Sequence, residues 1–122
     1  MTGTFINLTN HPTSLWSAEQ LSAAGQYGHI INMPFPAVSP TAGNAEINDL
    51  ADECTAKIRT FEEPTVLVQG EFTLVFAIVT RLKAEGVRAV AACCAREIIE
   101  SKLEDGAVLK KAVFRFKGFR EY

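Results

Sequence analysis

The sequence lacks the features that mark several large classes of protein. Its three cysteines are an odd number without CxxC spacing, which argues against a disulfide framework. It has only two histidines, and they do not stand in a spacing typical of metal ligands. No run approaches the roughly 20 apolar residues of a membrane-spanning helix. We therefore expect no metal, no cofactor and no membrane partner, and we expect Cys93 and Cys94, which lie in an apolar run, to be buried, reduced thiols.

A surplus of positive charge is also missing. The formal net charge is -2 and the isoelectric point is near 5.7. A protein that coats duplex nucleic acid usually carries a basic excess, so we expect no duplex partner, although a local basic patch is still compatible with these values. Asn7, Asn10 and His11 interrupt the apolar residues near the start, unlike a signal peptide. These features predict a cytoplasmic protein.

Length and apolar content predict one domain over residues 1–122. Hydrophobic residues make up 48% of the chain, enough for one core without disulfides or metals. Apolar runs bounded by turn residues, at 5–8, 29–33, 65–68 and 87–92, predict strands and alternate with helical patterns. The first helix is expected to end at Gly25 or Gly28, the second has apolar residues at helical spacing from Ile47 to Ile58, and the third is expected at 74–84. Ser17 and Asn44 are expected to cap the first two helices.

The pattern changes after Arg96. Residues 97–101 and 113–117 alternate and flank Asp105-Gly106, a hairpin signal. The sequence therefore predicts an α/β fold. Specifically, we expect a three-layer Rossmann-like doubly wound sheet of four parallel strands, followed by a C-terminal antiparallel β-hairpin.

Polar residues follow the predicted parallel strands at the end where open α/β sheets bind ligands. The candidate ligand-binding residues are Thr9, Asn10 and Ser14 after the first strand, Gln69, Gly70, Phe72 and Thr73 after the third, and Arg96 after the fourth. The candidate catalytic residues are His11 and Glu71. These loops predict a pocket for a nucleotide- or phosphate-sized ligand.

The turn at Gly70 has two interpretations. A glycine between a buried strand and a helix start can expose backbone N–H groups to an anion. Alternatively, Gly70 only permits a tight turn and Glu71 only favours the helix N-terminus. Neither a P-loop pattern nor GxGxxG is present.

The other candidates also have alternatives. His11 could act as an acid or base near neutral pH, or simply bond its own backbone. Trp16 could stack on a base or close the first helix. Arg96 could bind a phosphate in bidentate fashion or pair with Glu97 or Glu100.

Aromatic and basic residues alternate near the C-terminus. Phe114, Phe116 and Phe119 interleave with Arg115, Lys117 and Arg120. An aromatic hairpin face is a natural seam for a homodimer. It could also pack on the domain's own core or contact a nucleic-acid backbone.

Several segments together resemble a known group of proteins. The resemblance rests on residues 5–12, Trp16-Ser17, Gln20-Leu21, 34–36, 69–73 and 119–122. They are similar to small bacterial and phage proteins that are labelled CRISPR-associated or uncharacterised. The fold also resembles CRISPR-associated Rossmann-fold (CARF) domains, which dimerise, bind cyclic oligoadenylates in antiviral defence and in some cases cleave them without metal. The resemblance implies that the loops after Leu8 and Ala92 face the ligand; Arg96 is the one cation expected there, with no lysine beside it.

Three functions follow as hypotheses. The first is a dimer that binds a cyclic or linear oligonucleotide and cleaves it with the substrate's own 2′-hydroxyl, with His11 as acid or base. Arg96 and the amides of 70–72 would then hold phosphate, and Glu71 would orient the substrate. The second is a non-catalytic nucleotide- or protein-binding module. The third is a hydrolase or transferase with Glu71 as general base.

Overall fold

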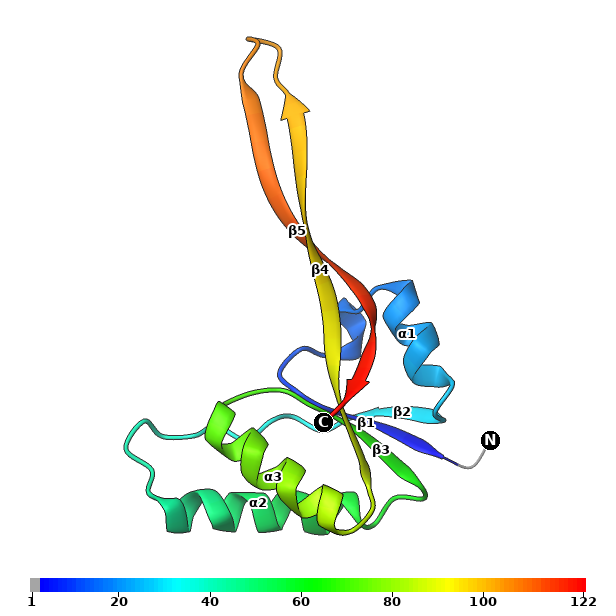
Figure 1. Cartoon of the computed structure of the whole chain (residues 1–122), viewed down its shortest axis with the longest axis vertical. Helices are drawn as coiled ribbons and strands as arrows, with labels where there is room; N and C mark the ends of the chain where they lie inside the picture. The colour runs from blue at the N-terminus through cyan, green and yellow to red at the C-terminus, as the bar shows by residue number, and fades with distance from the viewer. Residues whose placement is uncertain (1–2) are drawn as a thin grey trace.

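The elements of the computed structural model, which describes residues 3–122, run from sheet to helix and end in a long hairpin (Figure 1). The strands are β1 (Thr4–Leu8), β2 (His29–Asn32), β3 (Pro64–Val68), β4 (Arg88–Lys102) and β5 (Val108–Glu121). The helices are α1 (Ala18–Gly25), α2 (Asn44–Ile58) and α3 (Phe72–Ala84), with a short 3₁₀ turn at Thr13–Leu15.

The five strands form one sheet in the order β2-β1-β3-β4-β5. β1 pairs in parallel with β2 and β3, β3 pairs in parallel with β4, and β4 pairs antiparallel with β5. The predicted α/β class and the C-terminal antiparallel pair are therefore confirmed. The order reverses between β1 and β3, so the loops after these two strands leave the sheet beside each other.

The hairpin is longer than the sequence predicted, because its first strand is not separate from the last parallel strand of the sheet. β4 continues from the sheet through Arg96 to Lys102 and stays paired with β5 throughout. A register shift at Cys93/Cys94 bends the ladder there without ending it. The apolar run at 87–92 and the alternating run at 97–101 are thus two environments of one strand.

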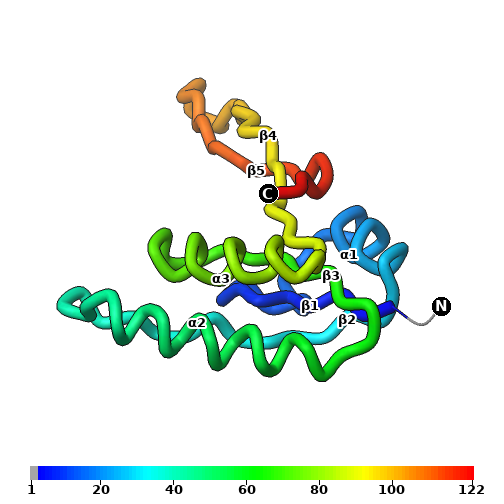
Figure 2. The backbone as a smooth tube through the Cα atoms, turned by 60° about the horizontal axis from the view of Figure 1, so that its bottom comes forward, coloured from blue at the N-terminus to red at the C-terminus, as the bar shows by residue number. Residues whose placement is uncertain are grey.

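The α2 and α3 helices cover one face of the sheet (Figure 2). Alternate strand residues Ile6, Leu8, Val66 and Val68 point to this face and are fully buried. The helix residues packed on them recur at helical spacing: Ile47, Ala51, Cys54 and Ile58 from α2, and Leu74, Ile78, Val79 and Leu82 from α3. Burial raises the pKa of the Cys54 thiol.

The other face is covered by α1 and by aromatic side chains. Phe5 lies at its centre, with the Phe119 ring centroid 5.0 Å away and Trp16 edge-on at 6.3 Å. Because α1 has only eight residues, Phe119 of β5 covers sheet surface that a longer helix would otherwise bury. The hydroxyl of Tyr122 donates to the Val68 carbonyl, which secures the end of β5 to β3.

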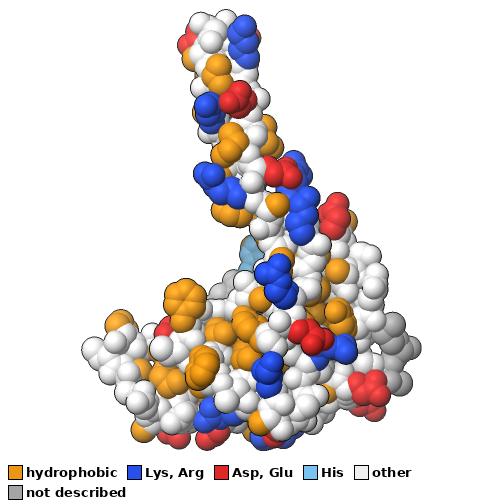
Figure 3. All heavy atoms as spheres, viewed as in Figure 1, with side chains coloured by type: hydrophobic (Ala, Val, Ile, Leu, Met, Phe, Trp, Pro, Cys, Tyr) orange, Lys and Arg blue, Asp and Glu red, His pale blue; other side chains and the backbone are white. Residues whose placement is uncertain are grey.

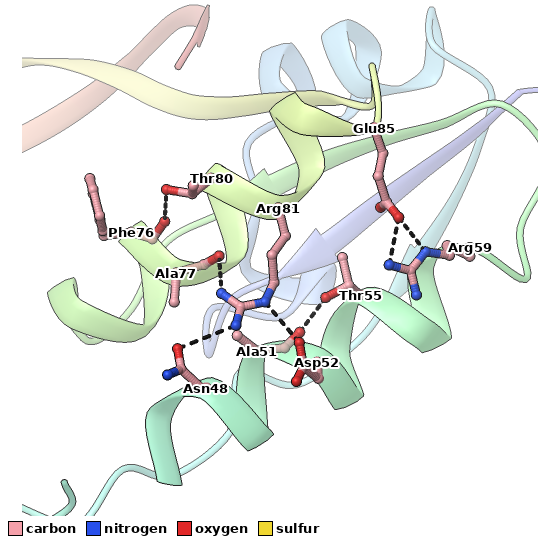
Figure 4. Close-up of polar contacts among 10 residues, drawn as sticks. All are labelled: Asn48, Ala51, Asp52, Thr55, Arg59, Phe76, Ala77, Thr80, Arg81 and Glu85. Carbon is pink, nitrogen blue, oxygen red and sulfur yellow. Dashed lines mark hydrogen bonds and ion pairs between the residues drawn. The ribbon is translucent and has the colours of Figure 1, made fainter. Parts of the chain in front are cut away.

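Helices α2 and α3 are joined by polar contacts at their edge (Figure 4). Arg81 of α3 donates to the Asp52 carboxylate at 2.9 Å and to the Asn48 side-chain oxygen at 3.2 Å, and Arg59 pairs with Glu85.

The helix caps can be compared with those expected from sequence. Ser17 caps α1 as predicted, since its hydroxyl accepts from the Gln20 amide. The Asn44 cap was wrong: α2 begins at Asn44 itself, and Gly43 is the N-cap residue.

Beyond the register shift, the hairpin projects from the body as an arm, defined here as residues 95–115 (Figures 1 and 3). Many of its apolar side chains are exposed, among them Ile98, Leu109 and Phe114. The prediction of buried thiols at the base of the arm was wrong, because Cys94 is exposed and Cys93 is only half-buried. Strand alternation places Cys94 on the α1 face, where no helix covers it.

Phe119 and Phe114, one packed on the body and one exposed on the arm, give a matched test of this packing. We expect Phe119→Ala to lower the free energy of unfolding by about 2–4 kcal/mol, because it removes the ring packed on Phe5. Phe114 is 69% exposed, so Phe114→Ala should change the free energy by less than about 0.5 kcal/mol. Urea unfolding of both variants measures the difference, and equal losses would contradict the described packing.

Candidate functional site

A cleft of about 850 Å³ opens where the base of the hairpin meets the carboxyl ends of β1 and β3. The loop after β1 and the start of α1 form one wall, and β4 and β5 form the other. Of the residues predicted from sequence, the cleft brings together Thr9, Asn10, His11, Gln69 and Gly70. Its volume suits a ligand of nucleotide size.

A buried asparagine fixes the loop wall of the cleft. The Asn7 side chain is 1% exposed, and its amide donates to the His11 carbonyl and to the Asn32 side-chain oxygen, both at 2.9 Å. Its own oxygen accepts from the Thr9 hydroxyl at 2.7 Å. Asn32 also binds Thr13, through the backbone amide at 3.3 Å and the hydroxyl at 3.1 Å. Every hydrogen-bonding atom of the Asn7 amide group is therefore used to hold the loop.

The backbone of His11 lies at the centre of this network. Besides the Asn7 amide, the Trp16 indole N–H donates to the His11 carbonyl at 3.0 Å, and the His11 amide donates to Thr9. Trp16 is 7% exposed and packs edge-on to Phe5. Of the two interpretations of Trp16, this burial favours a structural role at the start of the first helix and not a role in stacking on a base. The backbone of His11 is thus held while its exposed side chain lines the cleft.

The opposite wall comes from β5 and contains residues for which the sequence indicated no place in this site. Phe114, Arg115, Phe116 and Lys117 line the cleft together with Cys94 of β4. Arg115 pairs with Glu97, whereas the Lys117 amine lies 3.9 Å from the same carboxylate. The alternating aromatic and basic pattern was the available signal. It was not linked to this site because only the tertiary fold brings β5 against the loop after β1.

Gln69 and Gly70 close the floor of the cleft by structural contacts. The Gln69 side-chain oxygen accepts from the Ala92 amide at 2.9 Å, which extends the β3–β4 pairing beyond its last backbone partners. A Cβ at Gly70 would lie 2.6 Å from the Phe35 ring. Glycine is therefore required at this turn by the close approach of Phe35.

Glu71 is the N-cap of α3. Its carboxylate accepts from the Thr73 and Leu74 amides at 3.1 and 2.8 Å, and from the Thr73 hydroxyl at 2.6 Å. The Thr73 hydroxyl, and then the Leu74 and Thr73 amides, lower the pKa of this carboxyl. A carboxylate with a lowered pKa is a weak base, and it already occupies the amides that an external anion would need.

The remaining predicted residues lie outside the cleft lining. Ser14 is exposed in the 3₁₀ turn, and Phe72 and Thr73 are exposed on the first turn of α3. Arg96 is exposed on β4 opposite the cleft residue Phe114, so the two side chains share one face of the ribbon at the edge of the cleft. Neither Glu97 nor Glu100 forms an ion pair with Arg96 in the described part of the chain.

Within residues 3–122, no group of three or more histidine, cysteine, aspartate or glutamate side chains is arranged to hold a metal ion. None of the helices described there has the length and apolar character needed to cross a bilayer.

Comparison with known proteins gives one match. A family model with the description "Uncharacterized protein MJ1673 family" matches residues 3–120. No curated protein and no solved structure matches the chain.

The Asn7 network predicts a strong effect of an isosteric change. Asn7→Asp would place carboxylate oxygens against the His11 carbonyl and the Asn32 oxygen, at a cost of about 3–5 kcal/mol in the free energy of unfolding at neutral pH. Burial, together with the two acceptor oxygens that would face it, raises the pKa of the new carboxyl in the folded state. The loss should therefore grow as pH rises through the usual carboxyl range and shrink as pH falls. Urea unfolding at several pH values measures it. Asn10→Asp, at an exposed position, is the matched control, and an equal effect of the two would refute the network.

The Glu71 cap predicts a pH-dependent loss of stability. Glu71→Ala should lower the melting temperature at neutral pH, because two helix amides and the Thr73 hydroxyl lose their acceptor. The pKa of Glu71 is lowered in the folded state, so its contribution is present above the ordinary carboxyl pKa and disappears as pH falls through the lowered value. Melting curves of the variant and the parent should converge in acid. A constant difference across pH would show that the carboxylate charge has no part in the cap.

Proposed function

The chain belongs to the Uncharacterized protein MJ1673 family, and from the geometry of the cleft we propose that it binds a nucleotide or a short oligonucleotide there. One observation carries the proposal. Two aromatic side chains and two cations of β5 line the same cleft as the polar loop after β1. A base, a sugar and a phosphate need these kinds of partner within one site.

The aromatic side of the cleft supports a stacking role. Phe116 is half-buried, with its ring 4.9 Å from Phe119, so its position is supported from behind. Phe114 lines the same cleft and is 69% exposed. A nucleobase placed against these rings would gain about 1–3 kcal/mol from stacking, with little dependence on which base it is.

The cationic side supports a phosphate role for Lys117 above all. Arg115 already pairs with Glu97, whereas the Lys117 amine is held by the same carboxylate only at 3.9 Å. Lys117 can therefore turn to a phosphate at small cost. The imidazole of His11 and the amide of Asn10 line the facing wall and can donate to further phosphate or sugar oxygens.

The phosphate site proposed here differs from the one expected from sequence, which lay at the N-terminus of α3 and Arg96. The amides at the N-terminus of α3 donate to the Glu71 carboxylate, and Arg96 does not line the cleft, although it pairs with the cleft residue Phe114. We therefore place phosphate near Lys117 and His11, with Arg96 available to a ligand long enough to extend along the arm. Glu71 has a structural role in this proposal.

Strand cleavage is a second candidate function, favoured by the position of His11 in the cleft. In a cyclic oligoadenylate, a 2′-oxygen could attack the adjacent phosphorus as the bond to the 5′-oxygen breaks. The products would be a 2′,3′-cyclic phosphate and a 5′-hydroxyl, with the 2′-proton removed and one proton delivered to the leaving oxygen. His11 could carry out either transfer, and Lys117 could stabilise the charge on phosphorus.

The remaining expectations from sequence stay part of this proposal. The reversal of strand order between β1 and β3, and helices on both faces, support the Rossmann-like three-layer description. The similarity to CRISPR-associated domains, a role in antiviral defence and a cytoplasmic location remain predictions.

Binding is tested with purified protein and a panel of AMP, ATP, linear oligoadenylate and cyclic oligoadenylates. Calorimetry should show binding to at least one of them. Lys117→Ala should weaken it roughly tenfold to a hundredfold, as expected for loss of a charge-assisted contact. Phe116→Ala should weaken it by about the 1–3 kcal/mol of one stacked base.

Matched controls and a turnover assay separate the outcomes. Arg120→Ala and Phe72→Ala alter exposed residues of the same types outside the cleft lining and should leave affinity unchanged. Chromatography of cyclic oligoadenylate after incubation tests cleavage, which His11→Ala should abolish while it weakens binding less than Lys117→Ala does. Absence of binding across the whole panel would refute the nucleotide proposal, and binding without product would remove only the cleavage step.

A further inference from the structure

The arm has no covering element in the described part of the chain. Its two strands pair only with each other beyond Cys94, and both ribbon edges are open there. Near its tip, Ile99, Leu103, Val108 and Leu109 are 41–57% exposed. An isolated two-stranded ribbon is marginally stable in water, and exposed apolar edges promote pairing with another chain. The arm is thus suited to pack on a second surface.

A second apolar surface lies at the start of α3. Phe72 and Phe76 are 89% and 74% exposed, and with Ile47 of α2 and Ala77 they line a groove of about 420 Å³. The Phe76 side chain points away from the polar contacts that join α2 and α3 (Figure 4). Two adjacent exposed phenylalanines on a helix are typical of an interaction surface.

The arm and this groove face one open corner of the molecule. α3 begins in the angle between the arm and the body, and hydrophobic side chains gather over this part of the body (Figures 1 and 3). The arm points away from its own groove. A second copy turned end for end would lay its arm along the first and bring its tip to the groove.

Charge also matches the arm to the body. From Cys93 onward the chain has seven lysines and arginines against five acidic residues, whereas residues 1–92 have five against nine. Near the arm tip, Lys110 pairs with Glu100, and Glu104 and Asp105 lie in the turn, whereas Lys102 and Lys111 form no ion pair in the described part of the chain. α2 beside the groove carries Glu46, Asp49 and Glu53 against Lys57, with Asp52 already paired with Arg81. Ion pairs between the two free lysines of one copy and the acidic side of α2 in another would favour the arm of one copy on the body of the other.

We propose that two copies of this chain form a dimer by reciprocal exchange of arms, with each arm tip seated on the Phe72–Phe76 groove of the other copy. A phenylalanine buries roughly 150–250 Å² when fully covered, and twofold symmetry makes the contact twice. When both phenylalanines, both contacts and both surfaces of each contact are counted, the buried area is on the order of the 1,200–2,000 Å² of a stable interface. The proposal does not rest on the nucleotide function, because neither the groove nor the tip of the arm contributes a residue to the cleft.

The test measures oligomeric state by light scattering after size exclusion. The full-length protein should be a dimer. Phe76→Glu in the groove and Leu109→Glu at the arm tip should each give monomers, because either change puts a carboxylate into the contact. Leu21→Glu, on the exposed side of α1 and outside both the groove and the cleft, should leave the dimer intact. Far-UV circular dichroism checks that each variant is folded.

Mixing the two monomeric variants tests the reciprocal geometry. The Phe76→Glu copy keeps a normal arm and the Leu109→Glu copy keeps a normal groove, so a mixed pair regains one intact contact. We expect the mixture to form a heterodimer that neither variant forms alone. A monomeric parent protein would overturn the proposal and leave the arm for a different partner. A dimer lost in Leu109→Glu but kept in Phe76→Glu would overturn it in favour of arm-to-arm packing.

Discussion

The buried amide of Asn7 is the constraint on which the candidate site depends. It lies near the carboxyl end of β1, just before the backbone leaves the sheet after Leu8, and the polar groups of the loop that follows need new partners. One side chain supplies them by bonding the His11 carbonyl, the Asn32 side chain and the Thr9 hydroxyl. Because Asn7 itself is buried, breaking one of these bonds would leave a polar atom of its side chain without water or a partner. The wall of the cleft is fastened to the body for that reason.

The need of backbone polar groups for a hydrogen-bond partner also explains why the N-terminus of α3 is not expected to bind an anion. Helix N-termini leave several amides without acceptors, and a bound phosphate can supply the missing oxygens. Here the protein supplies its own from Glu71. The free donors and cations of the region are instead found across the sheet, on the loop after β1 and on β5. The electrostatics of the cleft are therefore set by side chains more than by the helix dipole.

Local patterns were sufficient to predict most of the elements. The continuous apolar runs at Ile6 and Val66 indicated strands covered on both faces, and the helical spacing from Ile47 to Ile58 indicated the buried side of α2. The hairpin was recognised from Asp105-Gly106, but its length was not, because the register shift at Cys93/Cys94 has no distinct local signal.

The residues of the candidate site were harder to predict. Asn7 was interpreted only as a strand residue, and the role of its side chain depends on partners up to 25 residues away. Lys117 and Phe116 could be seen as part of a pattern, but only the β4–β5 register brings them to the cleft. Gly70 was assigned to the turn correctly, whereas the contact that requires it comes from Phe35 in a different loop.

The two walls of the cleft continue into different parts of the molecule, and this has a mechanical consequence. One wall is bonded into the body by Asn7, while the other is the root of a lever whose far end extends well beyond the body (Figure 1). A small rotation at that root moves the distal end through a long arc, and a displacement imposed at the distal end turns the root. A ligand that favoured one position of the arm would be thermodynamically linked to whatever the arm contacts, and that linkage would be equal in both directions. The geometry is that of a molecular lever with its fulcrum at residues 93 and 94.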